Sequence, residues 1–496
     1  MENRYYHSTR GNGKLSPKEA VLRGIADDGG LYVWDGLEDV RLDLDALLKL
    51  DYQEMAKRLF AEVLWDYSEE ELARCVDLAY TGKFDSEQIT PLVMAGDLPV
   101  LELFHGPTSA FKDVALCMLP QLMSTALNGR KEKVMIVTAT SGDTGKAALS
   151  GFQDAENIGI TVFYPYGKVS DIQRLQMVCQ QGENVRVCAI RGNFDDAQSG
   201  VKRLFHSAQA KAALDEDHIV LSSANSINIG RLVPQIVYYF AAYRQLLEAG
   251  AVQMGEEVNF CVPTGNFGNV LAGYYAKLMG LPVHRLIVAA NENNVLEDFL
   301  NTGVCDRNRP FHQTISPSMD ILISSNLERM LYYLSGKDSV RVAGWMKDLA
   351  EQGRYEVDAQ TKEKIASLFL SASCDNAQTS AQIRSVYTRC GYVMDPHTAV
   401  GAHVLEQLKD RLDGKVTVLL STASPYKFTR DVLKALGEAQ EGLDDFACMR
   451  KLEQLSKQKI PAGLYALKDM PERFADVISC EEMEEYVIAG AREILK

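Results

Sequence analysis

Lys112 is the first residue whose surroundings suggest chemistry. It lies in the segment FHGPTSAFKDVALCMLP (104–120), among small and aromatic residues and just before an apolar run. A lysine in such a setting is expected to be partly desolvated, which lowers its pKa and favours the neutral, nucleophilic amine. A neutral lysine can form a Schiff base with an aldehyde cofactor. The alternative is an ordinary surface lysine paired with Asp113.

A glycine-rich loop, VPTGNFGNV (262–270), joins a predicted strand to a predicted helix. Its two glycines, Gly265 and Gly268, let backbone N–H groups turn inward, and the start of the helix adds partial positive charge. This arrangement suits a phosphate monoester that is bound without Lys or Arg. The alternative is a tight strand-to-helix turn that needs glycine only for its backbone angles.

A third segment, TATSGDTGKAAL (138–149), also joins a strand to a helix. Hydroxyl and backbone N–H groups at a helix start suit a carboxylate or a phosphate. The segment is not a nucleotide-binding P-loop, because that motif needs glycine where Thr140 stands and a hydroxyl residue where Ala147 stands. A helix capped by a serine, with no ligand, is the plain alternative.

The elements that must position these segments are strands alternating with helices, beginning at about residue 100. Short β-branched runs occur at 133–140, 160–165, 185–190, 218–224, 257–265, 285–291 and 415–423. Because nearly continuous apolar strands alternate with helix-like segments, we expect an α/β fold with parallel sheets covered on both faces. In such sheets ligands bind at the carboxyl ends of the strands, where the chemistry should therefore lie.

The N-terminal part follows a different pattern. Residues 42–78 place Leu, Met, Phe and Val at spacings of three and four, which predicts amphipathic helices. We expect a mostly helical N-terminal domain at 1–95 and a smaller α/β lobe at 96–225. A larger α/β lobe is expected at 226–496, with a helical insertion at about 317–392.

Composition excludes several classes of protein. The chain has 496 residues, 46% of them hydrophobic and 24% charged, and a formal net charge of −15. An acidic chain has no general electrostatic reason to bind nucleic acid or anionic membrane, so an anionic ligand needs a local pocket. The ten cysteines lack zinc-type spacing, and no apolar run approaches the ~18–20 residues of a membrane span. We expect no metal, nucleic-acid or membrane partner, and a cytoplasmic location.

Together and in this order, the three segments resemble the threonine synthases, pyridoxal-phosphate enzymes with the fold of the tryptophan-synthase β-subunit. Further matches are SANSINIGRLVPQ (223–235), LSTASPYKF (420–428), YxSTRG (6–11), DGGLYV (28–33) and DPHTAVG (395–401). The resemblance spans roughly residues 5 to 430, and the long N-terminal segment is similar to that of the fungal and enterobacterial branch. It implies PLP fold type II, with pyridoxal 5′-phosphate between two open α/β lobes.

The resemblance also implies roles for single residues. Lys112 corresponds to the Schiff-base lysine, and Thr422 supplies the hydroxyl that faces the pyridine nitrogen. The cofactor phosphate is expected on the loop formed by Gly265, Asn266, Phe267, Gly268 and Asn269. The substrate carboxylate is expected at Ser141, Gly142, Asp143 and Thr144, and the leaving phosphate at Asn225, Ser226 and Arg231.

Two features depart from the family pattern. Lys146 follows the 138–145 loop where a small residue is expected, and Ser424 and Tyr426 stand where family members often have His and Ala. The expected reaction converts O-phospho-L-homoserine and water into L-threonine and phosphate, in a monomer or a homodimer. One rival is a serine or threonine dehydratase of the same fold, which needs no phosphate site at Arg231. The other is a PLP-binding protein without turnover.

Overall fold

The N-terminal part of the chain is mostly helical, as expected. The computed structural model describes residues 4–11, 13–140 and 142–495. A short antiparallel pair, β1 (His7–Ser8) with β2 (Tyr32–Val33), accompanies helices α1 (Pro17–Arg23), α2 (Leu44–Leu47), α3 (Tyr52–Val63) and α4 (Glu69–Tyr80). Helix α4 begins at a capping box, in which the side chains of Ser68 and Glu71 each accept a hydrogen bond from the other's backbone N–H. Local sequence signals therefore account for these helices.

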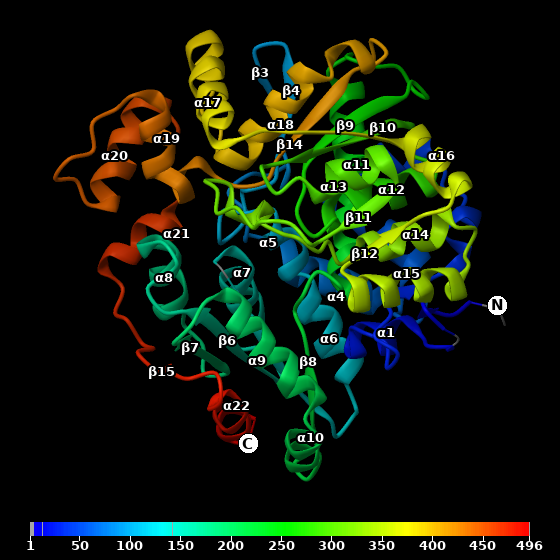
Figure 1. Ribbon diagram of the computed structural model, residues 1–496, viewed down its shortest axis with the longest axis vertical. Helices are drawn as coiled ribbons and strands as arrows, with labels where there is room; N and C mark the ends of the chain where they lie inside the picture. Colours follow the sequence, from blue (N-terminus) through cyan, green and yellow to red (C-terminus); the bar gives the residue numbers. More distant parts are fainter. Residues whose placement is uncertain (1–3, 12, 141, 496) are drawn as a thin grey trace.

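Two large sheets organise the rest of the described chain (Figure 1). The larger has the order β13 (Phe369–Ser373), β10 (Val283–Ala290), β9 (Val258–Pro263), β14 (Thr417–Ser421), β4 (Leu98–Glu102) and β3 (Leu92–Ala95). Its neighbouring strands are parallel except β3 and β4. The smaller is parallel throughout, in the order β15 (Val477–Ile478), β7 (Val185–Ile190), β6 (Ile158–Pro165), β5 (Lys133–Ala139) and β8 (Ile219–Ser222). The predicted α/β class is confirmed.

Helices cover both faces of the larger sheet. On β9 the ring of Phe260 packs edge-to-face on Tyr239 of α11 (Ile229–Glu248), with 4.9 Å between ring centroids. The next residue, Cys261, points its Sγ at the carbonyl of Gly401 on α18 (Pro396–Gln407), 3.5 Å away. Since successive strand residues point to opposite faces, α11 and α18 lie on opposite sides. The sheet is buried on both faces, which explains its continuous apolar strands.

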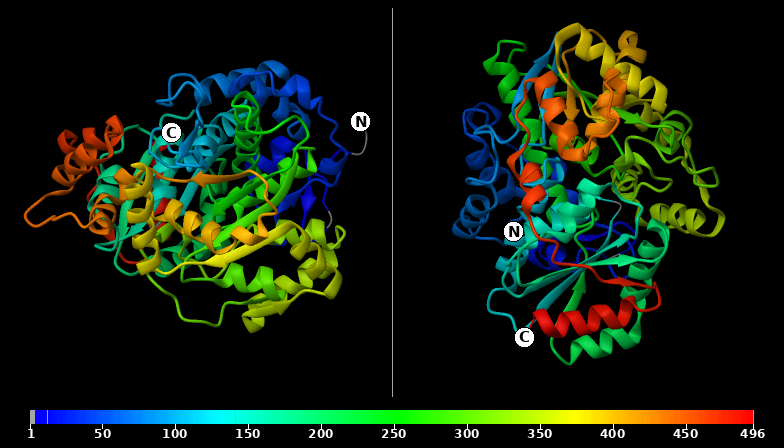
Figure 2. Two further views of the ribbon diagram at one scale, coloured as in Figure 1. Left: turned by 90° about the horizontal axis from the view of Figure 1, so that it is seen from above. Right: turned by 90° about the vertical axis from the view of Figure 1, so that its left-hand side faces the viewer.

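The smaller sheet is covered in the same way. Val162 of β6 lies against α7 (Asp143–Phe152), where a Cβ on Gly145 would stand 2.8 Å from a Val162 methyl. The neighbouring Phe163 packs on Tyr486 of α22 (Met483–Ile494), at 6.0 Å between ring centroids. Figure 2 shows the C-terminal helix, in red, running across this sheet. Helices α8 (Asp171–Val178), α9 (Phe194–His206) and α10 (Ala208–Asp215) complete the lobe.

The remaining elements surround the larger sheet and join the lobes. They are α5 (Lys112–Leu116), α6 (Leu119–Leu127), α12 (Gly268–Leu278), α13 (Val295–Thr302), α14 (Leu327–Leu334), α15 (Ser339–Gln352), α16 (Ala359–Leu368), α17 (Asn376–Cys390), α19 (Thr429–Leu436), α20 (Asp445–Ser456), α21 (Ala462–Tyr465) and the pair β11 (Val304–Asp306) with β12 (Arg354–Glu356). Among the described residues, none of these helices has the length and apolarity needed to cross a membrane.

The sheets divide the chain differently from the expected boundaries. Strand β3, expected in the N-terminal domain, and strand β4, expected in the smaller lobe, both join the larger sheet. Strand β13 lies inside the 317–392 region, which was expected to be mostly helical. The end of the chain returns to the smaller sheet, where β15 pairs with β7. Which sheet a strand joins depends on which strand edge is free in the folded protein, and local patterns do not carry that information.

The return of the C-terminal helix generates a stability prediction. Met483 on α22 is 1% exposed, and its Sδ lies 2.2 Å from where a Cβ on Gly200 would stand, so the two helices are in close contact. Replacing Met483 by Ala should lower the free energy of unfolding by about 2–5 kcal/mol, because it opens a cavity in the core. Urea unfolding followed by circular dichroism measures this, with Met254→Ala, at a residue 46% exposed, as the control. An unchanged unfolding midpoint would mean that α22 is not part of the core of the smaller lobe.

Candidate active site

Lys112 begins helix α5 and points into a buried cluster rather than to the surface. Its side chain is 11% exposed, and its Nζ lies 3.9 Å from Asp143 Oδ2 and donates to Ser318 Oγ at 3.5 Å. Burial lowers the pKa of Lys112 to about 8. Asp113 is not its partner, because that carboxylate accepts hydrogen bonds from the backbone N–H and the hydroxyl of Thr108. The surface-lysine alternative is therefore wrong.

The carboxylate of Asp143 lies close to the side chains of two lysines, Lys112 and Lys427. Its Oδ1 lies 2.7 Å from the Nζ of Lys427, whose side chain is fully buried and also donates to the carbonyl of Thr108 at 2.9 Å. Burial by itself would raise the pKa of Asp143, but the charges of Lys427 and Lys112 outweigh it and lower that pKa below its usual range. A deprotonated carboxylate therefore faces the Lys112 amine.

This placement bears on the loop expected to bind the substrate carboxylate. A charged Asp143 repels a second carboxylate. We therefore expect this side chain to stabilise the protonated form of Lys112 rather than to bind the substrate carboxylate. The Gly142 N–H donates to Thr140 Oγ1 at 3.0 Å, and Thr144 is half-buried in the first turn of α7. Ser141 lies outside the described residues. The carboxylate role of this loop thus remains a prediction.

Ser318 is a residue that the sequence did not point to. Its hydroxyl contacts both Lys112 and Asp143 Oδ2, the latter at 3.3 Å. Its backbone N–H donates to His397 Nε2 at 3.1 Å, while His397 Nδ1 lies 2.7 Å from Asp395 Oδ2. Because the backbone N–H can only donate, Nε2 accepts and His397 carries its proton on Nδ1. His397 thus clamps the turn that carries Ser318, and the DPHTAVG motif was the only signal in this region.

Thr422 is brought beside Lys112 by backbone pairing between two distant segments. The N–H of Phe111 donates to the carbonyl of Thr422 at 2.9 Å. On either side, Leu103 N–H donates to Ser421 O at 2.9 Å and Ser424 N–H to Ser109 O at 3.0 Å. These bonds extend strand β14 alongside the segment before Lys112. These hydrogen bonds therefore fix the position of Lys112 relative to the end of strand β14.

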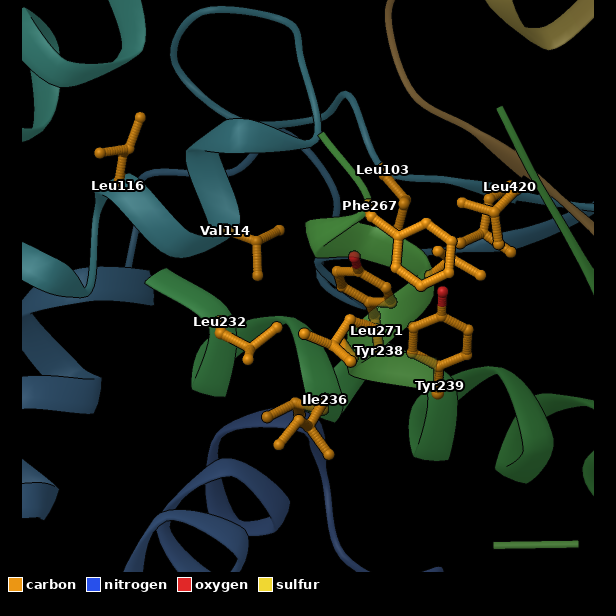
Figure 3. Packing of buried hydrophobic residues seen from close by; sticks show 14 of the residues in the cluster. Leu103, Val114, Leu116, Leu232, Ile236, Tyr238, Tyr239, Phe267, Leu271 and Leu420 are labelled. Carbon is orange, nitrogen blue, oxygen red and sulfur yellow. The ribbon is translucent and has the colours of Figure 1, made fainter. Parts of the chain in front are cut away.

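The glycine-rich loop presents unpaired donors, as its sequence predicted. Helix α12 begins at Gly268, after Phe267 in the left-handed conformation with φ 60°. No residue in the described part of the chain accepts a hydrogen bond from the backbone N–H of Asn266, Phe267 or Gly268. The buried Nδ2 of Asn269 has no partner there either. Its Oδ1 accepts from Tyr238 and Tyr239, whose rings lie beside Phe267 and Leu271 in Figure 3. This donor set fits the phosphate group of pyridoxal phosphate.

Gly265 shows why this loop needs glycine. A Cβ at this position would stand 2.5 Å from the carbonyl oxygen of Ser318, which is backbone and cannot move aside. The glycine-rich loop therefore packs directly against the turn that contacts Lys112. The two predicted cofactor contacts, the lysine and the phosphate loop, belong to one site.

Arg231, predicted to bind the leaving phosphate, is a buried guanidinium on α11. It is 3% exposed, and its Nη1 donates to the carbonyl of Ala224 at 2.8 Å. Its buried Nε has no partner within the described ranges, and burial lowers the pKa of Arg231 to about 10. A buried guanidinium that has a free donor and no carboxylate partner in the described part of the chain favours an anionic ligand. Asn225 and Ser226 lie half-buried on the turn that leads to it.

The residues that depart from the family pattern have partners of their own. Lys146 donates to Gln180 Oε1 at 2.6 Å, and burial lowers its pKa to about 8. Ser424 caps the turn after β14 by accepting from the N–H of Tyr426. Neither removes a predicted site residue from its place. Among the described residues, no group of His, Cys, Asp and Glu side chains is arranged to hold a metal ion.

Known families match this chain along most of its length. The family model "Threonine synthase N terminus" matches residues 5–80, "Pyridoxal-phosphate dependent enzyme" 85–373, and "Threonine synthase, C-terminal" 398–487. The chain belongs to the threonine synthase family. Its fold is PLP fold type II, and its cofactor is pyridoxal 5′-phosphate.

Individual members of the threonine synthase family are similar over nearly the whole chain. A threonine synthase of Pseudomonas aeruginosa is 40% identical over 439 residues, or 88% of this chain and 91% of that protein. The crystal structure of PLP-bound threonine synthase from Brucella melitensis has 37% identity and a TM-score of 0.88, and the match covers 99% of this chain and 100% of that one. Threonine synthase-like 1 of Homo sapiens is 38% identical over 96% of this chain but only 65% of the human protein. The chain thus spans about two thirds of the length of that relative.

The charges around Lys112 predict opposite effects of two substitutions. Lys427→Met removes a positive charge that lowers the pKa of Lys112, so this pKa should rise above about 8. Asp143→Asn removes a negative charge that raises it, so the pKa should fall. The measurement is the pH dependence of the rate at which the cofactor-free full-length chain captures pyridoxal phosphate. Its midpoint should move to higher pH in the first variant and to lower pH in the second.

Lys434→Met, at an exposed lysine on α19, serves as the control and should leave this midpoint unchanged. Circular dichroism establishes that each variant is folded. Shifts of the same sign in both variants would contradict the proposed arrangement of charges.

Proposed function

We propose that this protein is a threonine synthase that converts O-phospho-L-homoserine and water into L-threonine and inorganic phosphate. The observation that carries the proposal is the pairing of two anion-binding groups with one buried lysine. One is the glycine-rich loop, whose N–H groups have no acceptor among the described residues, and the other is Arg231, whose buried Nε has none there either. A phosphorylated substrate on a phosphorylated cofactor needs both.

Lys112 has two tasks in this proposal. It binds the cofactor covalently, and as a free amine it moves protons at the α- and β-carbons of the substrate. Its pKa of about 8 makes the neutral amine accessible near neutral pH. Asp143 and Ser318 would hold the protonated lysine in place, because both contact its Nζ. When bound, pyridoxal phosphate supplies the electron sink for the charge that develops on the substrate.

The other predicted residues bind and orient. Gly265, Asn266, Phe267, Gly268 and Asn269 would hold the cofactor phosphate, and Thr422 would face the pyridine nitrogen. A hydroxyl there does not stabilise a permanent positive charge as a carboxylate would, which suits elimination and replacement chemistry. Ser141, Gly142 and Thr144 would bind the substrate carboxylate.

Arg231, Asn225 and Ser226 would bind the γ-phosphate and retain it after it leaves the substrate. The retained phosphate dianion could then act as base toward the water that adds at the β-carbon. Protons returned at the γ- and α-carbons complete L-threonine.

A dehydratase acting on free serine or threonine is the nearer rival. Its substrate carries no phosphate for a buried guanidinium to bind. Without such a ligand, an unpaired Arg231 in the interior would only lower the stability of the fold. The unpaired Nε therefore favours a phosphorylated substrate. A second candidate is phosphate elimination without threonine formation, because it needs the same lysine and phosphate site and omits only the addition of water. We place the reaction in the cytoplasm, because all ten cysteines are free thiols and reduced thiols are typical of that compartment.

The test is the release of phosphate and the formation of threonine from O-phosphohomoserine by the full chain loaded with cofactor. Wild type should give equal amounts of both, and Lys112→Ala should give neither, because it lacks the covalent link and the proton carrier. Arg231→Ala should lose both products together by about 100-fold or more, a size typical of lost transition-state charge stabilisation. Phosphate without threonine would favour the second candidate, and no phosphate at all would contradict the proposal.

A further inference from the structure

We propose that Asn326 couples the two anion sites, so that phosphate bound near Ser226 and Arg231 tightens the hold of the protein on the cofactor phosphate. The inference rests on the function proposed above, since it takes both anion sites from it. Asn326 is fully buried just before α14, and it belongs to none of the predicted site segments. It is a positioning residue, because its contacts are with the two binding segments.

The side-chain amide of Asn326 bridges these segments directly. Its Nδ2 donates to the carbonyl of Asn266 at 3.0 Å and to Ser226 Oγ at 3.3 Å. The segments also touch here, since a Cβ on Gly268 would stand 3.7 Å from Ser226 Cβ and 3.5 Å from Asn326 Nδ2. One NH₂ group thus links the cofactor-phosphate loop to the segment of the substrate phosphate.

The contact with Asn266 sets the direction of the donors in the glycine-rich loop. A trans peptide points its C=O and its N–H in opposite directions. Asn326 holds the Asn266 carbonyl on the outside of the loop, so the N–H of Phe267 turns the other way. Ser324 does the same for the preceding peptide, because its hydroxyl donates to the carbonyl of Gly265 at 2.8 Å. These bonds pre-orient the unpaired N–H groups.

The hydrogen bond between Asn326 and Ser226 connects the substrate-phosphate site to Asn326. Because Ser226 Oγ accepts from Asn326, its own proton is left to donate to an anion. Donation to a phosphate polarises the hydroxyl and strengthens the hydrogen bond that it accepts, as in other hydrogen-bond chains. Phosphate at Ser226 therefore stabilises Asn326 in the orientation that holds Asn266.

Arg329 determines which way the Asn326 amide faces. Arg329 is completely buried, and its Nη1 donates to Asn326 Oδ1 at 2.6 Å. Its Nη2 donates to the carbonyl of Ile227 and its Nε to the carbonyl of Tyr32. Since the oxygen of the amide is bound to a guanidinium, the NH₂ group must face Asn266 and Ser226. The link is therefore built into the core rather than formed by a flexible surface side chain.

The experiment measures the rate at which the loaded full-length protein loses pyridoxal phosphate after dilution, with and without inorganic phosphate. Sodium chloride at equal ionic strength is the reference. A dissociation rate is not affected by phosphate that competes for the emptied cofactor site, so it reports the second site alone. In wild type, phosphate should slow the loss by about fivefold or more, the usual lower size of coupling between sites.

Two variants separate the parts of the link. Asn326→Asp preserves the size of the side chain and an oxygen that accepts from Arg329, but it removes the NH₂ donors. This variant should therefore lose cofactor faster than wild type and show no phosphate effect. Ser226→Ala should also abolish the phosphate effect, because the chain of hydrogen bonds is cut on the other side. Asn308→Ala, at an asparagine whose side chain donates to the carbonyl of Gln352 at the end of α15, should keep the wild-type effect.

No slowing in wild type would overturn the coupling, and equal slowing in wild type and Asn326→Asp would overturn the role of Asn326. The assay uses neither substrate nor turnover, so it stays separate from the test of the proposed function. A protein that forms threonine but shows no phosphate effect would refute the coupling alone. A protein that shows the effect but forms no threonine would refute the proposed reaction alone.

Discussion

The buried ion pair between Asp143 and Lys427 is the interaction on which the rest of the site depends. Asp143 comes from the smaller lobe, whereas Lys427 and Ser318 belong to the larger one. Charges removed from water cost several kcal/mol each unless they are closely paired and further hydrogen-bonded. The lobes are therefore held in the position that satisfies Asp143, and Lys112 lies in the field that this pair creates. One electrostatic requirement thus links the closeness of the lobes to the reactivity of the lysine.

The two proposed anion sites solve one problem in different ways. An acidic protein cannot attract phosphates through its overall field, so each site provides local donors. The glycine-rich loop uses backbone N–H groups at a helix start, which cost no charge and demand close approach of the backbone. Arg231 uses a buried guanidinium, which costs desolvation but offers directional donors. The first suits a resident cofactor, and the second suits a group that must arrive and leave.

The N-terminal region and the C-terminal end work from outside the two sheets. The N-terminal segment reaches the site through Arg329, which donates to the carbonyl of Tyr32, and through Glu328, which pairs with Arg10. The last helix, α22, packs on one face of the smaller sheet (Figure 2). Parts of the sequence that carry no predicted site residue thus support the position of those that do.

The sequence by itself determined the class of fold, the cofactor family and the motifs at the ends of the strands. Each of these is written in short stretches, such as GNFGN or the segment around Lys112, where local residue types and spacing suffice. Tertiary structure decided the rest: that Lys112 faces Asp143 and not Asp113, that β13 joins the larger sheet, and that Ser318 and Asn326 reach the site. These contacts join residues 31 to 206 positions apart. Such contacts depend on how the chain packs as a whole, because a buried charge or amide takes whichever partner the surrounding core brings within reach.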